Sequence, residues 1–92
     1  MATFDIGETV ICSCEVKDGT GAYKDPSTSM TITIIGRGDF KHVADVAMTK
    51  NSVGHYHYDF NSVGVSADSF TVVYKATDGT RITIEKERFD LN

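Results

Sequence analysis

Apolar residues recur at every second position through most of this chain, and this period of two constrains its fold more than any other feature. In residues 9–16, the side chains of Val10, Cys12, Cys14 and Val16 fall on one side of an extended backbone. Successive side chains of a β-strand point to opposite faces, so the alternation predicts a strand with one buried and one solvent-facing side. Five further stretches alternate in the same way, and we predict a strand in each: residues 29–35, 43–48, 55–60, 70–76 and 80–85.

Residues that favour turns separate these stretches. Asp78-Gly79 lies between the last two and is a strong hairpin signal, because both residues accept the positive φ angles of a two-residue turn. Asn51-Ser52-Val53-Gly54 and Asn61-Ser62-Val63-Gly64 place the same turn residues on both sides of residues 55–60. The other predicted turns are Asp18-Gly19-Thr20-Gly21, Asp25-Pro26-Ser27 and Gly36-Arg37-Gly38-Asp39.

The end of the sequence continues the alternation with charged residues. Residues 85–88 read Glu-Lys-Glu-Arg, and Phe89 and Leu91 follow with one residue between them. This spacing predicts that the last strand extends beyond residue 85 and places Phe89 and Leu91 on one face. Charged residues in such a strand are typical of an exposed sheet edge that is protected against strand-to-strand association.

The number and spacing of the strands indicate the fold class. No stretch keeps a 3.6-residue period over a helical length, and six or seven short strands at intervals of about 8–12 residues are typical of a β-sandwich or a small barrel. Gly54-His55-Tyr56 also has the Gly-x-Tyr pattern of a tyrosine corner, in which the phenol bonds back to the preceding turn. We therefore predict an all-β chain in which residues 1–92 form a single immunoglobulin-like Greek-key β-sandwich of about seven antiparallel strands.

The cysteine of an antibody domain is missing from this pattern. Tyr58 stands where an antibody domain has the second cysteine of its disulfide, and the chain contains no tryptophan. The prediction therefore concerns the shape of the sandwich and not a disulfide-pinned antibody domain.

Size and charge exclude several classes of function. Nine Lys and Arg residues against thirteen Asp and Glu residues give a formal net charge of −4 over 92 residues, so we expect no nucleic-acid binding. A helix that spans a bilayer needs about 20 apolar residues, and no apolar run approaches that length, so we expect no membrane insertion. Residues 1–8 lack the positive start and apolar core of a signal peptide, and we expect synthesis in the cytoplasm without a cleaved signal.

His55 and His57 are weak candidates for metal ligands. They share one face of the strand predicted at residues 55–60, and Asp59 comes next on that face. Two imidazoles could hold a metal ion if a neighbouring strand supplied a third ligand. Tyr56 and Tyr58 claim the core face, however, so we expect both histidines to face solvent or a partner, and we predict no cofactor.

Cys12 and Cys14 are interpreted as small buried hydrophobic residues. Both leave the same face of one strand, where a disulfide between them would bend the strand out of its pairing. The alternative is a small metal or redox protein that uses both cysteines together with His55 and His57. The cysteine spacing is not the one usual for such sites.

Arg37-Gly38-Asp39, followed by Phe40, is a weak candidate for partner binding. The tripeptide resembles the cell-adhesion signal that integrins read, which needs an exposed tight turn holding a cation and a carboxylate apart. Gly38 permits such a turn. Gly and Asp are also the ordinary residues of loops, so the tripeptide by itself remains a hypothesis.

The sequence offers no catalytic residues. No Gly-x-Ser-x-Gly elbow is present, no two carboxylates are spaced for acid/base work, and residues 18–21 lack the length and the Lys-Ser/Thr end of a phosphate loop. We predict that the protein is not an enzyme.

The order of the strand and turn signals resembles that of small immunoglobulin-like proteins encoded in the structural modules of tailed bacteriophages. The resemblance covers nearly the whole chain. One departure is the absence of Trp: relatives often have an aromatic residue that closes the Tyr-x-Tyr strand, and here Phe60 takes that place. The matching segments are Ile6-Gly7-Glu8-Thr9-Val10, Asp18-Gly19, Asp25-Pro26-Ser27, Met30-Thr31-Ile32-Thr33-Ile34, Val53-Gly54-His55-Tyr56-His57-Tyr58 and Phe70-Thr71-Val72-Val73-Tyr74.

This resemblance implies a non-enzymatic structural protein of a virion, such as a capsid decoration, neck or tail component. Its partners would be other virion structural proteins or a second copy of the chain in a homo-oligomer, and its location would be the virion after synthesis in the host cytoplasm. Such a protein acts by contact, through loops or strand edges. The alternative is an adhesion or carbohydrate-binding immunoglobulin-like module that uses the loop at residues 37–39 or outward-facing Tyr and His side chains.

Overall fold

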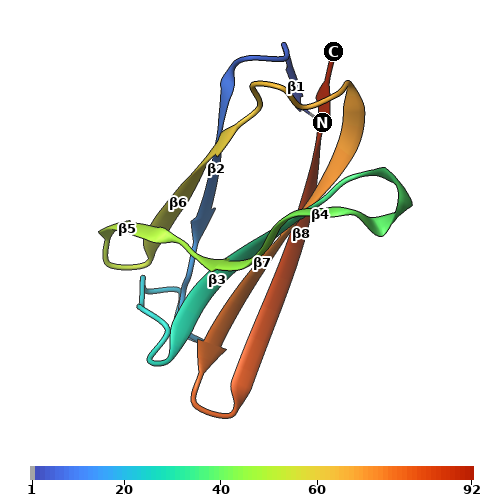
Figure 1. Cartoon of the computed structure of the whole chain (residues 1–92). Helices are drawn as coiled ribbons and strands as arrows, with labels where there is room; N and C mark the ends of the chain where they lie inside the picture. The colour runs from blue at the N-terminus through green and yellow to red at the C-terminus, as the bar shows by residue number, and fades with distance from the viewer. Residues whose placement is uncertain (1) are drawn as a thin grey trace.

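The computed structural model describes residues 2–92, which fold into eight strands arranged in two sheets (Figure 1). Arg37–Asp39 form the one 3-10 turn within that range, as expected from the lack of helical periodicity. The larger sheet has the strand order β1 (Ala2–Phe4), β8 (Arg81–Leu91), β7 (Asp68–Asp78), β3 (Ser29–Ile35) and β4 (Lys41–Ala47). The smaller sheet has the order β2 (Thr9–Glu15), β6 (His55–Asn61) and β5 (Thr49–Ser52).

This arrangement confirms the predicted immunoglobulin-like sandwich. The smaller sheet corresponds to strands B, E and D of that fold, and β3, β7 and β8 correspond to C, F and G. One detail differs from the predicted antiparallel set, because β1 runs parallel to β8, with Ala2 opposite Phe89 and Phe4 opposite Leu91. The first strand therefore joins the larger sheet and leaves the outer edge of β2 unpaired.

Two strands lie outside the predicted stretches. β1 has only three residues, and β5 is Thr-Lys-Asn-Ser with every residue exposed. β1 is too short to show a period and β5 has no apolar residue, and each lies at a sheet edge, held by backbone pairing to a single neighbour. Asn51 and Ser52, predicted in a turn, belong to β5, and the hairpin turn is restricted to Val53 and Gly54.

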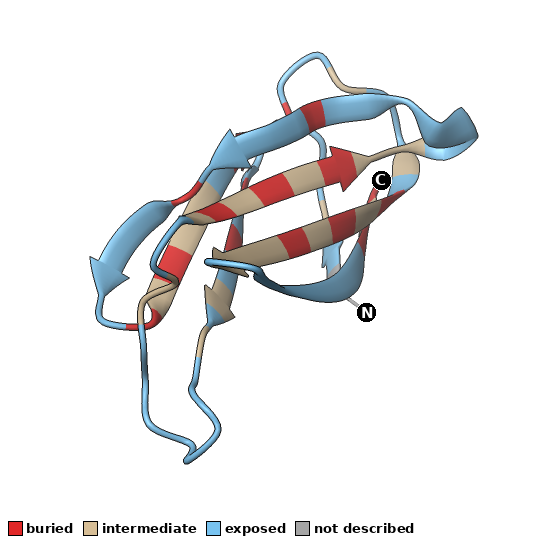
Figure 2. Cartoon of the chain, turned by 90° about the horizontal axis from the view of Figure 1, so that it is seen from below, coloured by how far each residue is buried: buried red, intermediate tan, exposed pale blue. Residues whose placement is uncertain are grey.

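The core lies between the facing sides of the two sheets, where buried residues form regular bands along the strands (Figure 2). Ile32, Ile34 and Val72 are fully buried in the larger sheet. Phe70 stacks on Phe89 with ring centroids 5.0 Å apart. The remaining core residues are Val10, Cys12, Met30, Val43, Met48, Tyr56, Phe60, Tyr74 and Leu91.

The prediction of a tyrosine corner at Tyr56 is wrong, because the phenol bonds to a different segment from the one predicted. The Tyr56 hydroxyl donates a hydrogen bond of 3.0 Å to Oδ1 of Asp25, which lies in the loop between β2 and β3 and not in the preceding turn. The two-residue turn before β6 is too short to reach back to the phenol. A tyrosine corner also belongs near the start of strand F, which here is β7.

The described residues include no helix long and apolar enough to cross a membrane.

Candidate interaction site

His55 and His57 lie on the outer face of β6, and each contacts groups of its own sheet. Nε2 of His55 is 3.8 Å from Oε1 of Glu15, and Nε2 of His57 is 3.9 Å from Oδ1 of Asp59. Nδ1 of His57 hydrogen bonds to the side chain of Asn51. Within residues 2–92, no three His, Cys, Asp or Glu side chains are placed to hold a metal ion together.

Cys12 and Cys14 lie on the opposite, inner face of the same sheet, so the structure does not bring them together with the histidines. Both thiols are free. Burial, reinforced by Glu87, raises the pKa of Cys12 to about 12, and burial with Glu85 nearby raises the pKa of Cys14 to about 11. Both thiols therefore stay protonated at neutral pH, which fits small packing residues better than nucleophiles or ligands.

Arg37-Gly38-Asp39 forms the exposed turn between β3 and β4. Gly38 and Asp39 both have positive φ angles, 71° and 61°. Asp68, at the start of β7, holds the turn: its Oδ2 accepts the Arg37 N–H at 2.8 Å, and its Oδ1 lies 3.5 Å from Nε of Arg37. A receptor that reads this tripeptide would have to compete with Asp68 for the guanidinium.

Three loops lie toward one end of the sandwich, which we call the loop end: residues 5–8, 36–40 and 62–67, of which the second sits beside the start of β7, where Asp68 holds it. The first and third are joined by the Gly7 N–H, which donates to Oγ of Ser62 at 2.9 Å. Figure 1 shows these two loops beside the C-terminus. Each of the three loops exposes one large apolar side chain, and these are Ile6, Phe40 and Val63.

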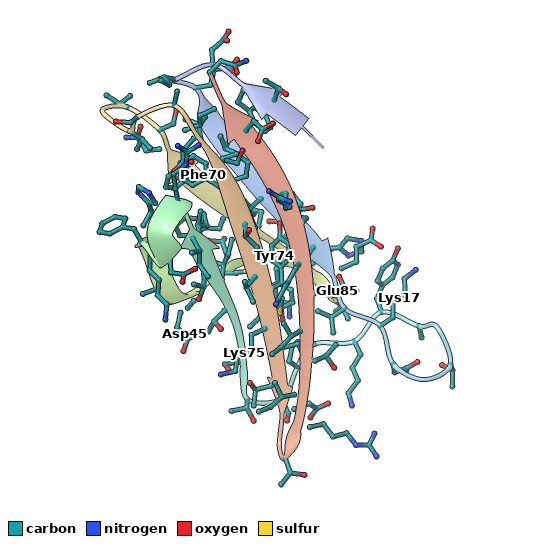
Figure 3. The ribbon with its side chains drawn as sticks, turned by 90° about the vertical axis from the view of Figure 1, so that its right-hand side faces the viewer. Lys17, Asp45, Phe70, Tyr74, Lys75 and Glu85 are labelled. Atoms are coloured by element: carbon teal, nitrogen blue, oxygen red, sulfur yellow. The ribbon has the colours of Figure 1, made fainter. Side chains whose placement is uncertain are left out.

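One edge of β8 is unpaired over most of its length. β7 pairs with β8 along its whole length, but β1 covers only Phe89–Leu91 on the opposite side (Figure 3). Residues 81–88 therefore have no strand on the side away from β7 within the described chain, and all eight are exposed. Phe89 and Leu91 are buried on one face, as predicted, so Ile82 and Ile84 lie on the outer face of the sheet.

A groove runs between the free edges of β2 and β8, where the two sheets are not closed by a further strand. One hollow of about 800 Å³ is lined by residues that include Cys14, Tyr74, Glu85 and Glu87. A second, of about 520 Å³, continues along the same two strands. The Tyr74 hydroxyl donates to Glu87, and burial raises the pKa of Tyr74. The β8 wall of the groove therefore carries two carboxylates beside a neutral phenol and a neutral thiol.

The chain matches no protein-family model, and comparisons with curated proteins and with solved structures find no significant match.

The charges at residues 85–88 are visible in the sequence, but the groove and the length of the free β8 edge are not. Both depend on β1 pairing with β8 over only three residues. No local signal in the sequence states where a short first strand will pair.

Proposed function

We propose that this protein is a non-enzymatic structural component of a tailed-phage particle, which binds a larger protein assembly through its loop end. The sequence resemblance supports the type of assembly. The surface supports binding by contact, because the groove walls present a protonated thiol and a protonated phenol in place of an activated nucleophile.

The exposed apolar side chains of the loop end carry this proposal. Phe40 and Val63 are 64% and 68% exposed, and Ile6 is 42% exposed. Apolar side chains from three separate loops at one end of a small domain are typical of a protein-binding surface, since burying them against a partner stabilises the complex. Loops held on a rigid sandwich are also the usual carriers of binding residues.

Quantitative mass spectrometry of purified virus particles from the source culture tests the proposal. Copy numbers near that of the major capsid protein would indicate a capsid decoration, and a small fixed number would indicate a neck or tail component. Absence of the chain from the particles would overturn the proposal.

A matched pair of variants tests the surface. Phe40→Asp places a charge in the loop end, and we expect fewer copies retained on particles. Val53→Asp places the same charge on a residue that is 54% exposed in the β5–β6 turn, at the other end of the sandwich, and we expect full retention. Equal retention of the two variants would exclude the loop end as the attachment surface.

An adhesion module remains a second candidate, supported by the exposure of the turn at Arg37–Asp39. It predicts that the isolated protein binds cells and that Asp39→Ala abolishes this binding. Binding that survives the substitution would exclude the turn as the recognition element.

A further inference from the structure

The charges of β8 have no ionic partners within the described chain. Lys24 and Lys50 form ion pairs with Asp78 and Asp25, at 3.0 and 2.5 Å. The charged residues of β8 form none, and the side chain of Glu87 has only the Tyr74 hydroxyl. Neutral residues of β7 lie directly opposite the run at 85–88. Asp78 lies opposite Arg81, but its carboxylate is bound by Lys24 and Ser27 and forms no ion pair with Arg81. The unpaired charges of β8 are Arg81, Glu85, Lys86 and Arg88.

The outer face of the same edge is apolar at two positions. Ile82 and Ile84 are 57% and 54% exposed and stand next to the unpaired backbone edge. A strand added to this edge would bury part of both side chains and hydrogen bond to the free backbone groups. The occupant must also match the charges, which restricts its sequence.

The β8 strand of a second copy of the chain satisfies the requirement for matching charges. A two-fold axis through Ile84, perpendicular to the sheet, pairs two β8 strands antiparallel and keeps the inner faces of both copies on the same side. Ile84 then lies opposite its symmetry mate. Arg81 and Glu87, three residues before and after it, lie opposite each other in both halves of the interface. Thr83 lies opposite Glu85.

Neighbouring registers do not fit. A two-fold axis through Glu85 places Glu85 opposite its own copy, and an axis through Lys86 places two lysines together and Glu85 opposite Glu87. Like charges directly opposite each other destabilise a pair of strands. An axis through Thr83 avoids like charges but pairs only residues 81–85 of β8. The axis through Ile84 uses residues 81–87 without a like-charge contact.

We propose that two copies of this chain associate through residues 81–87 of β8, with Ile84 on the two-fold axis and Arg81 paired to Glu87 of the other copy. The two larger sheets then form one continuous sheet. Because the strands are antiparallel, the loop ends of the two copies point in opposite directions. The pairing concerns the isolated protein and does not depend on its attachment to a particle.

Sedimentation equilibrium of the full chain tests this association. We expect a monomer–dimer equilibrium in the wild type and, for Arg81→Glu, a dimer weakened by about tenfold or more, because two attractions become two repulsions. Arg81→Glu combined with Glu87→Arg restores the pairing and should recover the dimer. Lys41→Glu is the control, since it reverses another charge that has no ion pair, at the β4 edge.

Two results would overturn the proposal. One is a wild-type protein that stays monomeric up to about 1 mM, which would show that the charges only protect the edge. The other is an equal effect of Arg81→Glu and Lys41→Glu.

Cysteine cross-linking tests the register without relying on Glu87, whose replacement also removes the acceptor of Tyr74. Ile84→Cys brings two thiols opposite each other, within the Cα separation of about 4.4–6.8 Å that a disulfide needs. Lys86→Cys places the same group about 13 Å from its mate, because the two lie four residues apart in register. We expect a covalent dimer from Ile84→Cys under mild oxidation and none from Lys86→Cys or the wild type. Equal cross-linking of both variants would exclude this register.

Discussion

The Tyr56 hydroxyl and the Asp25 carboxylate connect β6 to the loop between β2 and β3 through a hydrogen bond of 3.0 Å. The same carboxylate oxygen accepts the Gly54 N–H at 2.9 Å, and the other oxygen contacts Nζ of Lys50 at 2.5 Å. One side chain therefore ties the β5–β6 hairpin to a loop that comes about thirty residues earlier in the sequence. The end of the sandwich opposite the loop end depends on this contact.

Removing the Tyr56 hydroxyl should destabilise the fold. Tyr56 is buried, so Tyr56→Phe should lower the free energy of unfolding by about 1 kcal/mol, the usual net contribution of such a hydrogen bond. Tyr23→Phe is the matched control: the Tyr23 hydroxyl lies 3.5 Å from Glu15 on the surface, and its loss should change stability by less than about 0.5 kcal/mol. Urea unfolding of both variants measures the difference. Equal effects would mean that the Tyr56–Asp25 bond contributes little.

Stability should fall in acid. The Lys50 ammonium, followed by the Gly54 N–H, holds the pKa of Asp25 below its usual range, and the Thr20 hydroxyl does the same for Asp18. A carboxyl whose pKa is lower in the folded state binds fewer protons there than in the unfolded chain. Its contribution is present above the ordinary Asp pKa of about 3.9 and is lost as the pH falls through the lowered folded pKa.

Thermal melts across this range measure the effect. We expect a nearly constant Tm above about pH 5 and a decline below about pH 4, with a shallower decline in Asp25→Asn. A Tm that does not change down to about pH 2 would contradict the role of these carboxylates.

The sequence predicted the strands whose faces differ in polarity. Residues 29–35 coincide with β3 because Met30, Ile32 and Ile34 alternate with polar residues. The stretch predicted at 43–48 was weaker, and the structure shows why. The β3–β4 register shifts around Asp45, which has a positive φ of 51°, and the bulge breaks the alternation. Edge strands such as β5 carry no apolar face, so only their pairing reveals them.

The surfaces were predictable only in part. The charges at residues 85–88 and the exposed turn at Arg37–Asp39 are visible in the sequence. Two other features result from contacts between residues far apart in the chain. Asp68 holds Arg37, and β1 leaves the edge of β8 unpaired over residues 81–88. Periodicity carries no information about such contacts.

The two thiols should react slowly in the native protein. Because the pKa of Cys14 rises from 9.0 to about 11, its thiolate fraction near pH 8 falls by about a hundredfold, and its modification should slow by a similar factor. Cys12 is buried and should react more slowly still. Rates with an aromatic disulfide reagent, compared between native and denatured protein, test this. Native rates close to the denatured ones would indicate a reactive site on β2.

Two glycines with similar backbone angles should tolerate alanine very differently. Gly54 has a φ of 73° and Gly79 a φ of 63°, so either substitution strains the backbone. A Cβ atom on Gly54 would lie 2.6 Å from the Val16 carbonyl oxygen and 2.8 Å from Cβ of Tyr23, whereas a Cβ on Gly79 would meet open space.

We therefore expect Gly79→Ala to cost about 1 kcal/mol of unfolding free energy and Gly54→Ala to cost more than about 2 kcal/mol. The difference arises because Val16 and Tyr23, in the loop after β2, pack directly on the β5–β6 turn, the same region that Asp25 holds through the Gly54 N–H. Urea unfolding of the two variants measures the gap. Equal losses would mean that the turn and the loop move apart without cost.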